Sequence, residues 1–113
     1  KDETSVSLLG WGSFSGDLAL RSLLATVNPE RGWGSWNWGK SSNAKLDQLL
    51  TQAFATTEPR GREALVRDAM AAAMTNVPVI PLHHQIVAWA MRSDLAYVAR
   101  TDEFTFAHLF KPR

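Results

Sequence analysis

The chain has 113 residues, and its twelve basic and eleven acidic side chains leave a net charge of +1. This balance removes the usual electrostatic reason to expect binding to nucleic acid or to an anionic membrane. No apolar run approaches the length needed to span a bilayer. The absence of cysteine excludes disulfides and thiolate metal ligands.

The first informative stretch is an apolar run at residues 5–10, followed by the loop Trp11–Asp17, which reads WGSFSGD. The run predicts a short strand buried on both faces. A glycine-rich loop at the end of a strand brings backbone N–H groups and an indole face together, and α/β proteins often bind ligands there. Trp11 is therefore either a ligand contact or a core residue. Asp17 either caps the next helix or belongs to a cleft.

A helix is predicted over residues 18–27, because apolar side chains recur at helical spacing until Asn28 and Pro29 end it. Residues 28–40 then form a loop with three tryptophans. If this loop is extended, Trp36 and Trp38 point to the same side and form a stacking platform. The alternative is a loop held together by its own indoles. The candidate ligand-binding residues are Trp11, Gly12, Ser13, Phe14, Asp17, Trp36 and Trp38.

Two amphipathic helices follow, and both are expected to supply the core. The first has cap candidates in residues 41–43, and the second begins near Thr57, the expected cap, and Pro59. The apolar stripe of the first helix comprises Leu46, Leu49, Leu50, Ala53 and Phe54. That of the second comprises Leu65, Val66, Ala69, Met70, Ala73 and Val77.

The C-terminal third reads as extended chain, because Pro78 and Pro81 exclude a helix there. Residues 79–84 and 86–91 are predicted to be extended, residues 95–98 to form a short strand, and the aromatic C-terminus to need a partner surface. His83 and His84 would point to opposite faces of a strand, so we expect no metal site. No cofactor and no enzymatic activity are expected, because the familiar catalytic and phosphate-binding motifs are missing.

Four stretches in register resemble the C-terminal portion of the extracytoplasmic solute-binding proteins of the peptide/nickel class, which serve ABC importers. They are Leu9-Gly10-Trp11-Gly12-Ser13 with Gly16-Asp17, then residues 42–50, residues 55–60, and residues 79–84 leading to Trp89-Ala90-Met91-Arg92. The resemblance extends over residues 6–112.

The resemblance implies an α/β fold that forms part of the second lobe of a type II periplasmic-binding-protein-like structure, with two core helices packed on a small mixed sheet. Residues 1–76 would belong to that lobe, and residues 77–113 would return to the first lobe. The chain would be part of a longer periplasmic protein that closes on a solute and delivers it to permease subunits. Cut free, we expect it to self-associate through residues 86–110.

The resemblance leaves the ligand open, because peptide, glutathione, nickel-chelate and oligosaccharide binders share this pattern. Peptide-binding relatives typically carry an aspartate, which pairs with the peptide α-amine, where this chain has Phe14. A phenyl ring lacks the charge-assisted hydrogen bonds of a carboxylate, so we expect no strong preference for a free amine. The alternative function is a free-standing carbohydrate-binding or carbohydrate-active domain that uses the tryptophan-rich loop.

Overall fold

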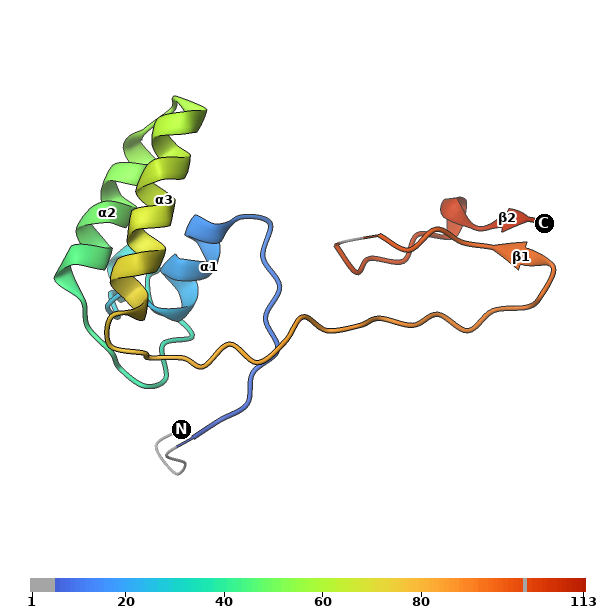
Figure 1. Cartoon of the computed structure of the whole chain (residues 1–113), viewed down its shortest axis with the longest axis horizontal. Helices are drawn as coiled ribbons and strands as arrows, with labels where there is room; N and C mark the ends of the chain where they lie inside the picture. Colours follow the sequence, from blue (N-terminus) through green and yellow to red (C-terminus); the bar gives the residue numbers. More distant parts are fainter. Residues whose placement is uncertain (1–5, 101) are drawn as a thin grey trace. The chain divides into compact units, whose positions relative to one another are not determined.

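The computed structural model describes residues 6–100 and 102–113 and divides the chain into two compact units, residues 1–80 and 81–113. The described chain combines three α-helices with one two-stranded antiparallel sheet (Figure 1). The predicted mixture of helices and strands is thus confirmed. The helices all lie in the first unit and the sheet lies in the second.

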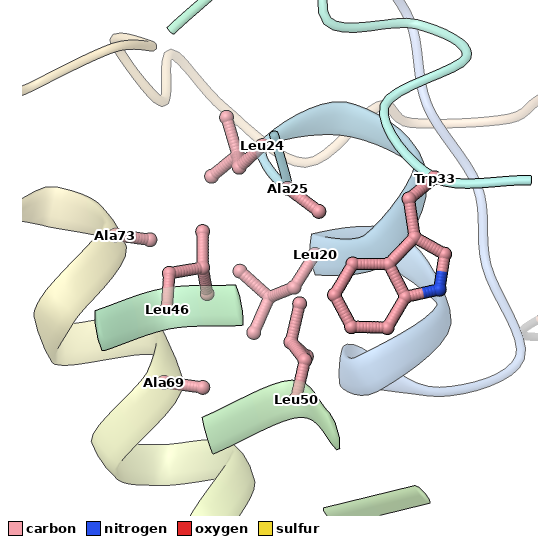
Figure 2. Packing of buried hydrophobic residues seen from close by; sticks show 8 residues of the cluster. All are labelled: Leu20, Leu24, Ala25, Trp33, Leu46, Leu50, Ala69 and Ala73. Atoms are coloured by element: carbon pink, nitrogen blue, oxygen red, sulfur yellow. The ribbon is translucent and has the colours of Figure 1, made fainter. Parts of the chain in front are cut away.

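The core of the first unit lies between α1 (Gly16–Leu23), α2 (Ala44–Ala55) and α3 (Pro59–Met74). Small side chains on α3 face the leucines of α2, which lets the two helix backbones approach closely along their length. Figure 2 shows how leucines from α1 and α2 meet these alanines and one indole ring. The core cluster comprises Leu20, Leu24, Ala25, Trp33, Leu46, Leu50, Ala69 and Ala73.

The predicted stripe of α2 is largely confirmed, whereas that of α3 is partly wrong. Leu46, Leu50 and Ala53 are buried, but Met70 and Val77 are exposed. On α3 the buried face is centred on alanines, including Ala72, because α2 packs against these small residues and leaves the longer side chains at the margin.

The prediction of a buried strand at residues 5–10 is wrong for its described part, residues 6–10, which form no strand. Val6 and Leu8 remain 88% and 82% exposed. A strand needs a partner for its backbone hydrogen bonds, and none pairs with these residues in the described chain. The helices likewise do not pack on a mixed sheet as expected, because α1 and the loop indole close their core. Residues 79–84 and 86–91 also form no paired strand.

The helix predicted over residues 18–27 begins and ends earlier, at Gly16 and Leu23. Ser15 occupies the N-cap position, so the predicted capping role of Asp17 is also wrong. The chain leaves the helix at Leu24, which accounts for the exposure of Val27.

Side-chain caps set the start of both long helices. The side-chain oxygen of Asn43 accepts the Leu46 amide, and its Nδ2 donates to the Ala72 carbonyl of α3 at 2.9 Å. The cap of α3 is Glu58 and not Thr57. Pro59 takes the first helical position, and the carboxylate of Glu58 accepts hydrogen bonds from the amides of Arg60 and Gly61. Asn43 thus joins the start of α2 to the end of α3.

Replacing Asn43 separates the energy of the cap from that of this bridge. Asn43→Ala removes both and is expected to lower the free energy of unfolding by about 1–2 kcal/mol. Asn43→Ser keeps a capping oxygen and should lose about 1 kcal/mol or less. Urea unfolding of the three proteins measures the order. Equal stability of the serine variant and the parent would show that the bridge to Ala72 contributes nothing.

The second unit, residues 81–113, is built around its aromatic side chains. The strand β1 (Leu95–Ala96) pairs antiparallel with β2 (Lys111–Pro112), which confirms the strand predicted within residues 95–98. Tyr97 stacks on Phe110 at a centroid distance of 4.7 Å, and Trp89 packs against Tyr97 at 5.5 Å. Leu109 and Phe110 are therefore partly covered within this unit, whereas Ala107 and His108 in the 3-10 turn Ala107–Leu109 are exposed, as are Phe104 and Phe106.

A search for membrane-spanning helices over residues 6–100 and 102–113 finds none that combines the required length and apolarity.

Candidate functional site

The tryptophan-rich loop is fastened to the end of α1 by backbone hydrogen bonds. The amide of Gly34 donates to the carbonyl of Arg21, and the amide of Trp36 donates to that of Ser22, both at 2.9 Å. Carbonyls in the last turn of a helix have no partner within the helix. The loop supplies these partners, so the C-terminal end of α1 and the loop are built as one piece.

Gly34 allows this close approach. It has a φ of +66°, and a Cβ at this position would lie 2.7 Å from the carbonyl oxygen of Ala25. Asn37 secures the following turn from the inside: it donates from Nδ2 to the carbonyls of Ala25 and Ser41 and accepts the Ser41 amide on Oδ1. The loop backbone is therefore held without any contribution from the exposed indoles.

The three loop tryptophans have different environments. Trp33 is buried in the core, with the Arg31 guanidinium 4.1 Å above its ring, and a two-residue β-bridge to Asn28 directs it inward. Trp36 and Trp38 are 41% and 43% exposed, and their ring centroids are 5.3 Å apart. The loop forms turns and is not extended, but the rings of Trp36 and Trp38, which were expected to point to the same side, do lie together.

Trp11 joins this pair across a wide gap in the sequence. Its ring lies 5.2 Å from that of Trp36 in an edge-to-face arrangement, and 37% of the residue is exposed. We call Trp11, Trp36 and Trp38 the tryptophan cluster. Three half-exposed indoles in contact form an aromatic surface of the kind on which sugar rings and planar or apolar side chains stack.

The other candidate residues of this loop, Gly12, Ser13 and Phe14, follow Trp11 in the sequence and are exposed. Space around Gly12 would admit a side chain. The hydroxyl of Ser13 donates to the carbonyl of Ser15 at 3.0 Å, a contact that shapes the turn into α1.

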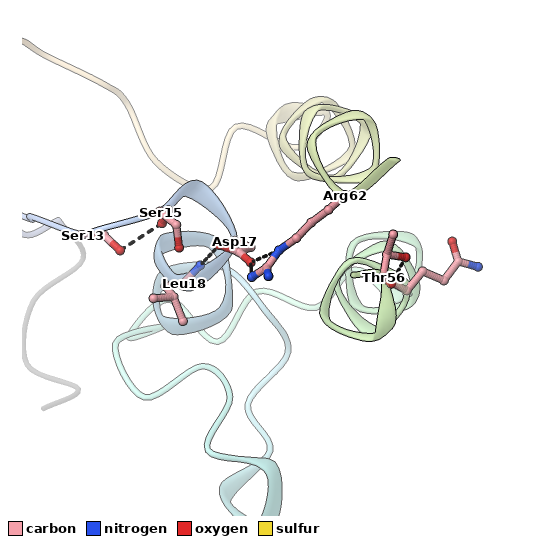
Figure 3. A network of polar contacts seen from close by, with 7 residues as sticks. Ser13, Ser15, Asp17, Leu18, Thr56 and Arg62 are labelled. Carbon is pink, nitrogen blue, oxygen red and sulfur yellow. Dashed lines mark hydrogen bonds and ion pairs between the residues drawn. The ribbon is translucent and has the colours of Figure 1, made fainter. Parts of the chain in front are cut away.

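Asp17 does not face a cleft. It is only 2% exposed, and the guanidinium of Arg62 on α3 donates to its Oδ2 from Nε at 3.1 Å and from Nη2 (Figure 3). Burial by itself would raise the pKa of Asp17. Hydrogen bonds from the Ser15 side chain, Arg62 and the Leu18 amide, with the positive charge of Arg62, outweigh burial and lower this pKa below its ordinary value. Asp17 therefore ties α1 to α3.

Beside the cluster lies a groove of about 380 Å³ that shares Trp38 with it. We call it the Val27 groove. The prediction did not include it, because Val27 was assigned to the core face of a helix that in fact ends before it. Its lining residues are Thr26, Val27, Gly34, Asn37, Trp38, Lys40 and Ser41.

A second, larger hollow of about 810 Å³ lies where α2 begins and α3 ends. It is lined by short side chains with Lys45 and Asp68, and it contains no aromatic residue. Over residues 6–100 and 102–113, no three histidine, aspartate or glutamate side chains come close enough together to hold a metal ion.

Comparisons of the chain with protein-family models, with curated proteins and with solved structures find no significant match.

Proposed function

We propose that this chain is the C-terminal part of a solute-binding component of an ABC importer and that the tryptophan cluster forms one wall of its ligand site. The observation that carries this proposal is the contact of Trp11 with Trp36. The two indoles come from the loop after residues 6–10 and from the loop after α1, and they meet while remaining partly exposed. The resemblance in four stretches of sequence supplies the class of protein.

Capture in this proposal involves no covalent chemistry. The rest of a two-lobed protein would close over the cluster, and affinity would come from removing the ligand from water between the indoles and the opposing lobe. Closure would present the loaded receptor to permease subunits at the outer face of a membrane, which places the protein in the periplasm. Self-association of the separated chain through residues 86–110 belongs to the same proposal.

Two features argue that the ligand need not carry a free amine. Phe14 stands where peptide-binding relatives typically have an aspartate. The one carboxylate of the Trp11–Asp17 loop, Asp17, is buried and paired with Arg62. A ligand ammonium at the cluster would therefore meet aromatic faces, where a cation–π contact is weaker than an ion pair with hydrogen bonds.

A carbohydrate-binding domain is the second candidate, favoured by the neighbouring, tilted rings of Trp36 and Trp38. Sugar rings stack their C–H faces on exposed indoles in such arrangements. Calorimetric titration with three probes compares a peptide-binding form of the first candidate with the second candidate: the dipeptide Ala-Phe, its N-acetylated form and maltotriose. Peptide binding that survives acetylation supports the first candidate, and binding of maltotriose alone supports the second.

Trp36→Ala is expected to weaken binding of the preferred probe by about tenfold to a hundredfold, as expected for an aromatic residue at the centre of an interface. The fold should lose little, because Trp36 is half-exposed and the loop is held by backbone hydrogen bonds. Trp89→Ala, which changes a tryptophan of the second unit, is the control and should leave the dissociation constant unchanged. Unaltered binding by Trp36→Ala would contradict the proposed site.

A further inference from the structure

The Val27 groove contains several polar residues, but the side chains of Thr26, Asn37 and Ser41 already make hydrogen bonds within the protein. Asn37 uses both its Nδ2 and its Oδ1 on backbone groups of Ala25 and Ser41, and the hydroxyl of Ser41 points to the same Oδ1 at 3.2 Å. The hydroxyl of Thr26 lies 3.1 Å from that of Ser42 and accepts the Asn43 amide. A ligand entering the groove would therefore gain few new hydrogen bonds from these side chains.

The rest of the lining is apolar or positively charged. Val27 is 48% exposed, the indole of Trp38 forms another wall, and Gly34 contributes backbone without a side chain. Lys40 is the charged residue among the lining residues, and none of them is acidic. A polar group placed here would lose its water without full compensation, and a cationic group would meet no acidic side chain among the lining residues.

We propose that the Val27 groove accepts an uncharged, apolar side group, aliphatic or aromatic, of a ligand whose adjoining part stacks on the tryptophan cluster. This inference rests on the proposed function, because the shared residue Trp38 joins the groove to the cluster. The volume of about 380 Å³ lies at the lower end of the range of ligand pockets, which gives room for a bulky side group and little room for an extended ligand. The ligand class is then a capped or neutral peptide, or a similar amide, with a bulky apolar residue.

The test uses the longer two-lobed protein that the proposed function implies, so that the opposing lobe is present. Its probes are three N-acetylated dipeptides that differ only in the second residue, Ac-Ala-Leu, Ac-Ala-Ser and Ac-Ala-Lys. Calorimetry should show that the leucine peptide binds about tenfold more tightly than the serine peptide, from burial of its side chain. The lysine peptide should bind most weakly. Val27→Ser should reduce the leucine preference to about twofold or less, by weakening binding of the leucine peptide.

Val98→Ser is the matched control, because Val98 is an exposed valine of the second unit, and it should keep the full preference. A leucine preference that Val27→Ser leaves intact, while Trp36→Ala weakens binding of all three peptides, would overturn the groove and retain the proposed function. Equal affinity for the three peptides would also overturn the groove. Absence of binding by all three peptides and by maltotriose would overturn both proposals.

Discussion

Gly34→Ala is expected to lower the free energy of unfolding by about 3 kcal/mol or more. A left-handed backbone costs a residue with a Cβ about 1–2 kcal/mol, and crowding adds about 1–3 kcal/mol where the surroundings cannot move. The added methyl would lie 2.7 Å from the Ala25 carbonyl oxygen and 2.8 Å from the Cα of Val27, and both are backbone atoms. Thermal and urea unfolding measure the loss.

Gly32→Ala separates the two causes. Gly32 has almost the same φ, +64°, but an added Cβ would meet no atom within 4 Å. This variant should therefore lose only about 1 kcal/mol, the cost of the backbone conformation. Equal losses in the two variants would contradict the close approach of the loop to residues 25–27. Because Gly34 also lines the Val27 groove, its alanine variant should bind the leucine peptide less well wherever it remains folded.

Asp17→Ala is expected to lower the free energy of unfolding by about 2–3 kcal/mol at pH 7. Breaking a buried ion pair usually costs about 3–5 kcal/mol, but the side chain of Arg62 is 43% exposed and can turn to water, which reduces the penalty. Glu63→Ala is the control. It breaks the pair with Arg67, in which both side chains are largely exposed, and should cost about 0.5 kcal/mol or less.

The contribution of Asp17 should also depend on pH in one direction. Its pKa in the folded protein is lowered, whereas an unfolded chain has an aspartate pKa of about 3.9. The stabilisation is therefore fully present above the unfolded value and is lost as the pH falls through the folded pKa. The difference in free energy of unfolding between the parent and Asp17→Asn should be constant from about pH 5 to 7, because this range lies well above the unfolded pKa of about 3.9. The difference should shrink in more acidic buffer. A difference that grows on acidification would contradict the lowered pKa.

Local patterns predicted the long helices well because the determinants of those helices lie within a few residues. The spacing of Leu46, Leu50 and Ala53 identified the buried face of α2, and Asn43 was among its expected caps. Pro59 marked the start of α3, although the cap lies one residue later than predicted. Such features depend on backbone geometry that neighbouring residues share.

Contacts between residues that are far apart in the sequence were less predictable. An apolar run such as residues 6–10 indicates a strand but carries no information on whether a partner strand is present. Asp17 and Arg62 are 45 residues apart in the sequence, and each resembles an ordinary polar residue near a helix start. The pairing of Trp11 with Trp36 was likewise not deduced. Trp11 was a candidate because it lies in a glycine-rich loop after an apolar run, and Trp36 because it would point to the same side as Trp38 in an extended chain.

The hydrogen bonds from the Gly34 and Trp36 amides to the last carbonyls of α1 leave the exposed side chains of this loop free to diverge. Any residue except proline supplies the amide at position 36, so the side chain there can change without loosening the helix end. The same holds at position 38, whose side chain is also outside the core. If the tryptophan cluster binds a ligand as proposed, its specificity can change by successive single substitutions, each with a small cost to folding, while positions 33 and 34 stay constrained.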